Sequence, residues 1–393
     1  MLKSIREAPT YRMSSLKIIK GVEFNMCIRL GEIIKYMENI APERLAESYD
    51  NVGLIVGNEK SEVKRIMVCL DVTSKVVDEA VNKSVDLIIS HHPTIFKGLK
   101  RINEEDIKGK VIYKLIKNDI GVFSAHTNLD VVDGGVNEHL AETLDLINLQ
   151  NLKKHKSLKL YKVVVFVPKE SVDKVREAMS SKGAGCIGNY SECSFMTKGT
   201  GTFKPLEGTN PYIGFTGELE YVNEVKIETI VSQEKLRNVI DKMVKSHPYE
   251  EVAYDVYPLN MEGKEYGLGK IGILKNPKTL DGFINTVKEK LNTKNVRVIG
   301  SVDKKIEKAA VFCGSYDESL NKIVMSKADV LVTGDVKYHS AVDMVEMGMC
   351  VIDAGHFGTE RIIVPKLVDM LKKQFENLDI LSNSVEEDPF IIY

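Results

Sequence analysis

Short, continuous runs of apolar residues, separated by stretches whose apolar positions have helical spacing, recur in both halves of the chain. In the first half, "RIMVCLDVT" begins at Arg65 and "DLIISHH" at Asp86; in the second, "KAAVFCGSY" begins at Lys308 and "DVLVTGD" at Asp329. The offset is 243 residues both from Arg65 to Lys308 and from Asp86 to Asp329. Such runs predict buried strands of an α/β sheet. Their repetition predicts two duplicated α/β lobes that face each other.

A third pair of predicted strands ends in the same polar pattern. "GVFSAHTNLD" and "MCVIDAGHFGTE" each place an acid four residues after a histidine, because Asp130 follows His126 and Glu360 follows His356. Apolar strands often agree by chance, but agreement in both spacing and polar endings is rarer. Ligands and reacting groups collect at the strand ends of α/β sheets, so these four residues are candidates for chemistry.

Two adjacent histidines follow the apolar run "DLIIS" at another predicted strand end. Taken singly, a loop histidine more often caps a turn than binds a metal. If the two lobes face each other, however, their strand ends converge and bring together five ligand-type side chains. These are His91, His92, Asp130, His356 and Glu360. Imidazole and carboxylate suit Zn²⁺, Mn²⁺, Fe²⁺ or Co²⁺, and five such groups can hold two ions.

A segment of different composition lies between the two lobes. Over residues 158–259 the pattern predicts strand, helix, two strands, helix and strand, which is the order of a ferredoxin-like α+β insert. Within it, "TKGTGTFKPLEGTNP" lacks the GK[ST] ending of a phosphate-binding loop and is interpreted as a hairpin or flexible loop. Lobe one is predicted over 26–150 and lobe two over 267–393, while 1–25 is expected to be a disordered extension or a misassigned start.

Composition narrows the class of protein. With 43% hydrophobic and 28% charged residues and a formal net charge of −2, the chain has no basic footprint for nucleic acid and no polybasic membrane arm. No apolar run approaches the roughly 18 residues needed to span a bilayer, and the first 25 residues lack the apolar core of a secretory signal. The six cysteines are scattered without a CxxC pair, which favours a reducing cytoplasm and argues against thiolate zinc sites.

Five strings in the same order carry a resemblance to a known family. The strings "LAESYDNVGLIVGN", "DLIISHHP", "SAHTNLDVVDGGVN", "ADVLVTGDVKYH" and "VIDAGHFGTE" resemble the Nif-three-like family of dinuclear metal proteins, known as GTP cyclohydrolase I type 2. The resemblance extends from Met26 to the C-terminus. The insert, with its ending "HPYEEVAYDVYPL", resembles the CutA-like, PII-like module of the longer bacterial members.

The resemblance implies roles for the five ligand residues. In such proteins the doubled histidine gives one ligand to each of two metals, here His91 and His92, and the acid of "HTNLD", Asp130, bridges the metals. His356 and Glu360 of "GHFGTE" complete the set. The identity of the two divalent ions stays open among Zn, Mn, Fe and Co.

Further residues are expected to handle protons or substrate at the same mouth. His126 is expected beside the metals, as a supporting group or an occasional ligand, and His339 and Asp335 of "GDVKYH" are candidates for proton or substrate handling. Lys97 and Lys337 flank two strand ends and would supply cations to a triphosphate. Either lysine is equally well explained as a solvated surface residue.

Two details concern the rim of the predicted site. Residues 49–51 of "YDNVGL" would brace the rim, although a capping turn is the simpler interpretation. Relatives often carry a "GGSG" turn where this chain keeps only Gly314 and Ser315, followed by Tyr316. If that turn contacts substrate in relatives, the substrate preference of this chain is open.

The family label implies a hydrolase in which a metal-activated water opens the imidazole ring of guanine in GTP and formate leaves. A phosphoester hydrolase would use the same ions. The alternative from another class is a non-catalytic, metal-binding regulatory or scaffold protein, which the PII-like insert favours. Similar proteins assemble as ring-shaped homohexamers, so a homohexamer with a small-molecule or nucleotide substrate is expected. Membrane or nucleic-acid partners are not expected.

Overall fold

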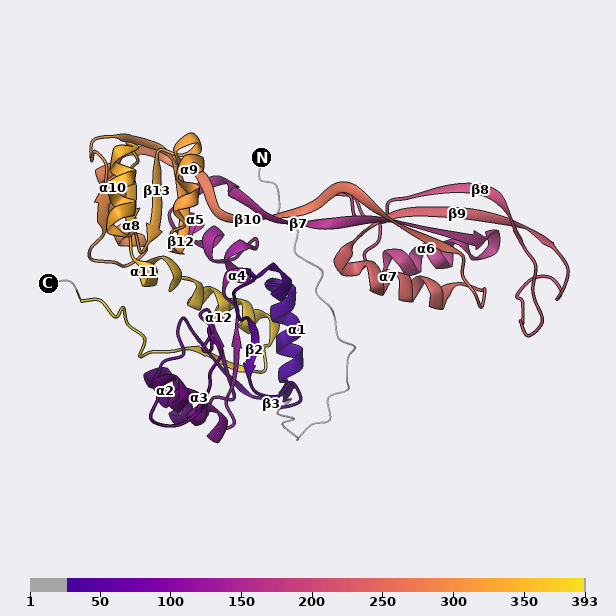
Figure 1. Ribbon diagram of the computed structural model, residues 1–393, viewed down its shortest axis with the longest axis horizontal. Helices are drawn as coiled ribbons and strands as arrows, with labels where there is room; N and C mark the ends of the chain where they lie inside the picture. Colours follow the sequence, from indigo (N-terminus) through magenta and orange to yellow (C-terminus); the bar gives the residue numbers. More distant parts are fainter. Residues whose placement is uncertain (1–26, 392–393) are drawn as a thin grey trace.

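The computed structural model describes residues 27–391, so the predicted extension over 1–25 lies outside the described residues. The architecture is mixed α/β with several sheets, as the apolar pattern predicts. Figure 1 shows two groups of strands and helices in a body, from which a long two-stranded ribbon extends to a smaller group of strands. No helix within 27–391 is long and apolar enough to cross a membrane.

A five-stranded sheet forms the first part of the body, in the order β15-β4-β5-β6-β2. Its strands are β2 (Gly53–Val56), β4 (Arg65–Cys69), β5 (Leu87–Ser90), β6 (Gly121–Ser124) and β15 (Asp379–Ser382). The central strands β4, β5 and β6 are parallel and almost wholly apolar because helices cover both faces of such a sheet. The edge strand β15 pairs with β4, although it lies within the segment predicted as lobe two. A short ladder joins β1 (Ile28–Arg29) to β3 (Glu62–Val63).

The second part of the body belongs to an eight-stranded sheet in the order β11-β14-β13-β12-β10-β7-β9-β8. Its strands within the body are β11 (Arg297–Ile299), β12 (Lys305–Ser315), β13 (Val330–Gly334) and β14 (Val351–Asp353). Strands β12, β13 and β14 run parallel, as β4, β5 and β6 do.

The register of the two parallel sheets agrees with the offset seen in the sequence. Ile66 pairs with Leu87 between β4 and β5, and Ala309 pairs with Val330 between β12 and β13. Each of the two residues of the first pair is therefore 243 positions before its counterpart in the second. The same ladder is built twice, with the same residues of each apolar run opposite one another.

The aspartate before each second strand has the same structural task in both sheets. Asp86 Oδ2 accepts hydrogen bonds from the backbone N–H groups of residues 64–65, at 2.7 and 2.9 Å. Asp329 Oδ2 accepts the equivalent pair from residues 307–308, both at 2.9 Å. These bonds satisfy backbone donors where each parallel pair begins, so this aspartate sets the start of the ladder.

Helices connect the strands and supply the apolar cover. In α1 (Leu30–Ile40), Leu30, Ile33 and Met37 are buried on one face because their spacing matches the helical period. Thr73 caps the next helix by accepting a hydrogen bond from the Val76 N–H. The remaining helices of the body are α2 (Ser74–Asn82), α3 (Ile107–Lys117), α4 (Thr127–Val131), α5 (Val136–Thr143), α8 (Leu280–Lys290), α9 (Asn321–Lys327), α10 (Tyr338–Glu346), α11 (His356–Glu360) and α12 (Ile363–Gln374). The part of the chain that the structure describes also has three short 3₁₀ turns, η1 (Glu43–Leu45) and η3 (Glu318–Leu320) in the body and η2 (Lys169–Ser171) at the far end.

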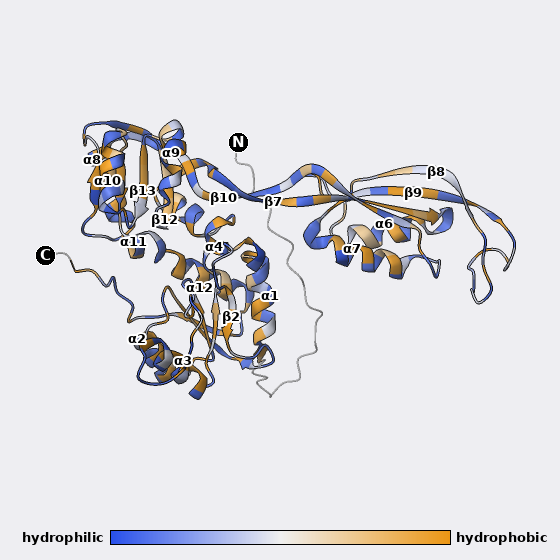
Figure 2. Cartoon of the chain, viewed as in Figure 1, coloured by the Kyte–Doolittle hydropathy of each residue, from blue (hydrophilic) through white to orange (hydrophobic). Residues whose placement is uncertain are grey.

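Strands β7 (Leu146–Pro168) and β10 (Tyr254–Thr279) are much longer than the strands that the sequence predicts for the insert. They pair antiparallel with several register shifts, from Leu274 opposite Leu146 to Tyr254 opposite Val165. Figure 2 shows hydrophilic residues along much of the stretch between the body and the far end. The insert is therefore joined to the body by a continuous ribbon.

At the far end the element order is strand, helix, two strands, helix and strand, and the strand order is β10-β7-β9-β8. The added elements are α6 (Val172–Ser180), β8 (Ser194–Phe203), β9 (Glu220–Ser232) and α7 (Gln233–Ser246). Part of the Gly- and Thr-rich run, predicted as a hairpin or loop, forms the edge strand β8.

Apolar packing separates the far end from the body. One core cluster contains residues from both body sheets, such as Ile66 of β4 and Val311 of β12 together with Leu367 of α12. A different cluster joins β7 and β9 to α6 and α7, and includes Val165 and Val239. The two body sheets thus share one core, and the far end has its own.

Candidate metal centre

His91 and His92 lie directly after β5, and the parallel ladder continues through them. The His91 N–H donates to the Cys69 carbonyl (3.2 Å) and the His92 N–H to the Leu70 carbonyl (2.9 Å). The Ser90 hydroxyl donates to the His92 carbonyl (2.8 Å). The backbone of both histidines is therefore held by the sheet, which fixes where their rings project.

The ring of His91 is wholly buried, and one of its nitrogens has no hydrogen-bond partner among the described residues. Its Nδ1 lies 2.9 Å from the Ala125 carbonyl, which can only accept, so Nδ1 carries the proton. Nε2 then faces the cluster, and no hydrogen bond satisfies this buried atom among the described residues, because the carboxylate oxygens of Asp130 and Glu360 lie 3.6 and 3.7 Å away. An oriented imidazole with a free Nε2 is the arrangement of a histidine metal ligand.

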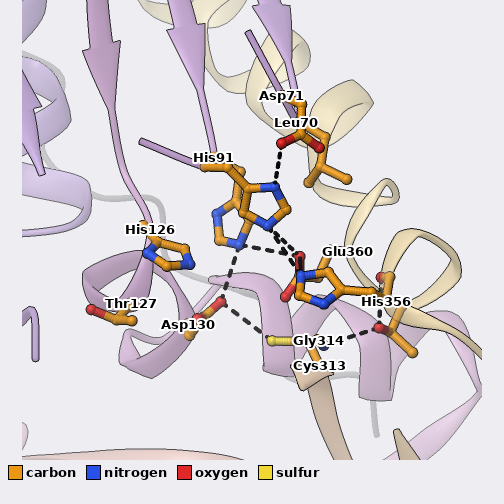
Figure 3. A network of polar contacts seen from close by, with 12 residues as sticks. Leu70, Asp71, His91, His126, Thr127, Asp130, Cys313, Gly314, His356 and Glu360 are labelled. Atoms are coloured by element: carbon orange, nitrogen blue, oxygen red, sulfur yellow. Dashed lines mark hydrogen bonds and ion pairs between the residues drawn. The ribbon is translucent and has the colours of Figure 1, made fainter. Parts of the chain in front are cut away.

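His92, His356 and Glu360 form the tightest part of the cluster (Figure 3). Glu360 Oε2 lies 2.9 Å from His92 Nε2 and 3.0 Å from His356 Nε2, and the two imidazole nitrogens are 3.2 Å apart. The Nδ1 atom of each ring faces a second carboxylate, Asp71 at 3.0 Å from His92 and Asp335 at 2.8 Å from His356. Such outer carboxylates orient histidine ligands and raise their basicity.

The charges of this cluster depend strongly on one another. Burial alone would raise the pKa of Glu360, but its contacts with the imidazoles of His356 and His92 and the nearby ring of His91 hold it well below its ordinary value. Burial opposes protonation of His92, yet Asp71 and Glu360 raise its pKa to about 10. The same opposition, with Glu360 dominating, raises the pKa of His356 to about 9. The cluster is therefore stabilised by positive charge, which a divalent cation would supply.

Glu360 is the carboxylate that reaches every imidazole of this cluster. Its Oε2 lies 3.7 Å from His91 Nε2 in addition to the two shorter contacts, whereas Asp130 Oδ1 approaches His91 Nε2 alone, at 3.6 Å. Burial and the nearby charge of Glu360 raise the pKa of Asp130, although His91 opposes this shift. Glu360 therefore contacts more of the candidate ligands than Asp130 does.

His126 lies on the opposite side of His91 from Glu360 in Figure 3. Its ring centroid is 5.3 Å from that of His91, and its Nδ1 is 2.9 Å from Asp50 Oδ1. Burial opposes ionisation of Asp50, but hydrogen bonds from His126 and Thr127 lower its pKa to about 2. Asp50, for which a capping turn was the simpler interpretation, therefore orients His126.

The loop that carries Asp50 also connects the site to the ribbon. The N–H of Glu47, three residues before Asp50, donates to the Thr127 hydroxyl (3.0 Å). On the ribbon, His155 Nε2 hydrogen-bonds the Leu45 carbonyl at 3.2 Å. One short segment thus touches both the ribbon and the residues around His126.

Residues that the sequence did not single out join the two parts of the body at the site. Asn137 Nδ2 donates to the Asp130 carbonyl (3.1 Å), while its Oδ1 accepts from the Cys313 N–H (2.9 Å). The Cys313 thiol lies 3.3 Å from Asp130 Oδ1. Asn137 therefore ties Asp130 to β12, and its only signal in the sequence was its place at the end of the string "SAHTNLDVVDGGVN".

Gly314, which the sequence retains from the expected glycine-rich turn, is required by close packing. It has φ +62°, and a Cβ atom there would lie 2.1 Å from Glu360 Oε1. Its N–H donates to the Thr359 hydroxyl at 3.0 Å. The neighbouring Tyr316 packs its ring against Phe312, with centroids 5.8 Å apart. The turn therefore shapes the wall behind Glu360.

The other predicted residues divide into two groups. Asp335 contacts His356, as described above, so its place is beside a candidate ligand. His339 packs against Tyr338 with ring centroids 5.3 Å apart. Within residues 27–391, Lys97 and Lys337 are exposed and make no hydrogen bond or ion pair with the cluster.

Two overlapping groups of side chains have the spacing to hold a metal ion. One contains His91, His92 and His126, and the other contains His92, His356 and Glu360; the ligand atoms of each lie within 4.8 Å of one another. The donor set is imidazole and carboxylate, which suits first-row divalent ions. Together with the unpartnered Nε2 of His91, these residues fit the metal that the sequence predicts.

The fold and this cluster define an α/β protein with a possible metal site at the meeting point of two sheets. The chain belongs to the Duf34/NIF3 (NGG1p interacting factor 3) family, whose sequence profile matches residues 28–389. The resemblance inferred from the five strings is therefore confirmed.

Named relatives support this assignment. The chain is 44% identical over 362 residues to a "GTP cyclohydrolase 1 type 2 homolog" of Halalkalibacterium halodurans, covering 91% of this chain and 97% of the relative. The Bacillus subtilis homolog of the same name is 43% identical with the same coverage. Among solved structures, a Bacillus cereus protein related to NIF3 superimposes with a TM-score of 0.87 at 43% identity, covering 93% of this chain and 99% of that one. A Staphylococcus aureus protein superimposes with a TM-score of 0.75 at 32% identity and the same coverage.

Proposed function

We propose that this protein binds two divalent metal ions and is a metal-dependent hydrolase, with opening of the guanine imidazole ring of GTP and release of formate as its reaction. The observation that carries metal binding is the buried, unpartnered Nε2 of His91 in a cluster of two further imidazoles and a carboxylate. The names of the relatives support the reaction, since they are homologs of GTP cyclohydrolase 1 type 2. When bound, divalent ions would activate water and polarise the electrophilic centre.

The five predicted ligands would share the work of holding the ions. His91 and His92 project from one strand end, and His356 and Glu360 come from one helix of the other lobe. We assign the bridging position to Glu360 because its Oε2 lies within 3.7 Å of His91 Nε2 and within 3.0 Å of the other two imidazoles. Asp130 would then complete the position beside His91.

His126 is the best-placed group for moving a proton. Asp50 holds its Nδ1 at 2.9 Å, which directs the remaining ring nitrogen away from that carboxylate and fixes the ring orientation. Its ring lies between 5.3 and 5.5 Å from those of His91 and His92, so a proton carried by it would be close to the metal ligands. Asp335 would orient His356, while His339 would act from the rim.

A non-catalytic, metal-binding regulatory role is the second candidate. It is favoured by the exposure of Lys97 and Lys337, which make no hydrogen bond or ion pair with the cluster within residues 27–391 and so form no built site for a triphosphate. A phosphoester hydrolase would fit the same ligands. These alternatives predict different products.

The deciding experiment incubates the metal-loaded protein with GTP and Mn²⁺ or Zn²⁺, and follows formate, a fluorescent pterin after oxidation, and phosphate. Formate with a pterin that disappears in His126→Ala, while bound metal is retained, supports the cyclohydrolase. Phosphate alone supports a phosphoesterase. Absence of every product from fully metallated protein would reject the hydrolase and favour the regulatory role. Glu79→Gln serves as the matched control, because Glu79 is a buried carboxylate that contacts Ser384, away from the cluster.

We further propose that residues 26–150 and 267–393 are duplicated lobes of one metal-binding domain, and that 158–259 is a ferredoxin-like, PII-like insert. Matching register in the two body sheets and the separate apolar core of the far end support this division. The proposed assembly is a cytoplasmic homohexamer. Light scattering of the purified chain measures its mass, and a monomer at micromolar concentration would reject the hexamer.

A further inference from the structure

The insert contains a large cavity that none of the metal ligands touches. Its volume is about 580 Å³, within the range of small-molecule sites. Its wall includes the Gly-Thr-Gly-Thr stretch of β8, which the metal site does not use. The cavity therefore belongs to a part of the chain for which the proposed hydrolase gives no role.

Strand register places the cavity on the face of the insert sheet that its helices leave uncovered. Gly199 pairs with Glu224, and Lys226 pairs with both Thr197 and Phe166, so these side-chain positions share one face. The alternate residues of β9, such as Val225 and Ile227, pack in the core with α6 and α7. The cavity thus lies opposite the helices.

Two glycines lie on that face, and close packing explains only one of them. A Cβ atom at Gly201 would lie 2.1 Å from Glu224 Oε2, so glycine there gives the carboxylate its place. A Cβ atom at Gly199 would meet nothing within 4 Å. Packing within the chain therefore does not require glycine at position 199. Because Gly199 has no side chain, a flat strip of backbone is left open to the cavity.

Aromatic side chains stand around this strip. The ring of Tyr249 lies 5.7 Å from that of Phe203 and 6.2 Å from that of Tyr212, both in the cavity wall. Aromatic rings at these distances offer faces and edges on which another planar ring packs well. The shape and lining suit a flat ring.

Glu224 is the polar group that gives this cavity its chemistry. Only 9% of its surface is exposed, and among the described residues its side chain has one hydrogen bond, from the Tyr249 hydroxyl at 3.0 Å. The nearby Lys226 ammonium pairs with Glu228 instead, and no ion pair to Glu224 occurs within residues 27–391. A carboxylate can accept about four hydrogen bonds, and a buried charge without compensation is costly. The site is therefore short of donors.

We propose that this cavity binds a planar nitrogen heterocycle whose adjacent N–H donors face Glu224. The ring lies on the backbone at Gly199 beside Phe203 and Tyr249, and the donors occupy the free acceptor positions of the carboxylate. This assignment does not depend on the metal site or on its reaction.

The test titrates the full-length, metal-loaded protein with 2-aminobenzimidazole, a planar probe with a fork of N–H donors, and with indene, a hydrocarbon of similar shape. Binding is measured by saturation-transfer NMR and calorimetry. Glu224→Gln is expected to weaken the aminobenzimidazole about tenfold or more, and indene less than about twofold, because only the former uses the charge. Gly199→Leu is expected to weaken both probes, since it fills the strip.

Asn223→Leu is the matched control, because Asn223 lies next to Glu224 in β9 on the opposite face. Metal content, measured in every variant, is expected to stay unchanged. Lack of binding by the unaltered protein at about 10 mM probe overturns the proposal, as would occupation of the cavity by a second copy of the chain that prevents binding. Equal affinity of the aminobenzimidazole for the unaltered protein and Glu224→Gln refutes the role of the carboxylate.

Discussion

On the proposed two-metal site, replacing Glu360 by glutamine should remove both ions, whereas replacing Asp130 by asparagine should remove about one. The reason is that Glu360 Oε2 faces the Nε2 atoms of all three imidazoles, at 2.9, 3.0 and 3.7 Å, whereas Asp130 Oδ1 approaches only that of His91, at 3.6 Å. Glutamine keeps the shape of the side chain but removes the charge that both ions would share.

The loss of metal affinity in Glu360→Gln has a lower bound. Loss of an outer group that only orients a ligand costs about 10- to 100-fold in metal affinity, so loss of a shared, direct ligand should cost at least about 100-fold, or about 2.7 kcal/mol, for each ion. For Asp130→Asn, one ion should retain its affinity within a few-fold. The two variants therefore differ in stoichiometry as well as in affinity.

Bound metal is measured by elemental analysis after gel filtration, and affinity by titration against a chromogenic chelator. Circular dichroism establishes that each variant is folded, and Glu79→Gln controls for the loss of a buried carboxylate elsewhere. If Asp130→Asn lost both ions while Glu360→Gln kept one, Asp130 would be the bridge, as the family resemblance implied, and the geometric argument would be refuted.

Three further predictions follow from the same contacts. Asp71→Asn should weaken metal binding about 10- to 100-fold without changing stoichiometry, which chelator titration would detect; unchanged affinity would show that the contact with His92 is dispensable. Metal affinity should fall as the pH falls, because the pKa of His92 is raised to about 10 and its proton must leave before a metal binds. Calorimetry in buffers of different ionisation enthalpy counts the protons released on metal binding. Binding without proton release would contradict this prediction. In the metal-free protein the pH dependence of stability runs the other way. The raised pKa of His92 contributes stability that is complete below the ordinary pKa of 6.5 and is lost as the pH rises towards about 10. Asn137→Ala should destabilise the metal-free protein by about 1–3 kcal/mol, measured by urea unfolding, because it leaves the Cys313 N–H without its buried acceptor; a change below about 0.5 kcal/mol would mean that the bond between lobes is replaced by another.

The sequence pattern by itself determined the strands and the candidate residues at their ends, because these depend on residues close together in the chain. Apolar runs predicted the strands because burial in a parallel sheet leaves no alternation along the strand, and the offset of Asp86 and Asp329 predicted that the same ladder would occur twice. The histidines and acids at strand ends were found from their spacing, and their convergence followed once two facing sheets were assumed. In the structure His91, His92, Asp130, His356 and Glu360 do lie together.

Only the tertiary structure decided which of these side chains contact one another. His92 and Glu360 are 268 positions apart, and nothing local tells which acid reaches which ring. The same holds for Asp50, whose contact with His126 depends on how two segments pack 76 positions apart. Pairing of β15 with β4, and the extension of β7 and β10 into a ribbon, likewise depend on which strand edge is free in the folded chain. Sequence pattern sets what each segment must bury, but only packing sets which surfaces meet, because many partners satisfy the same burial.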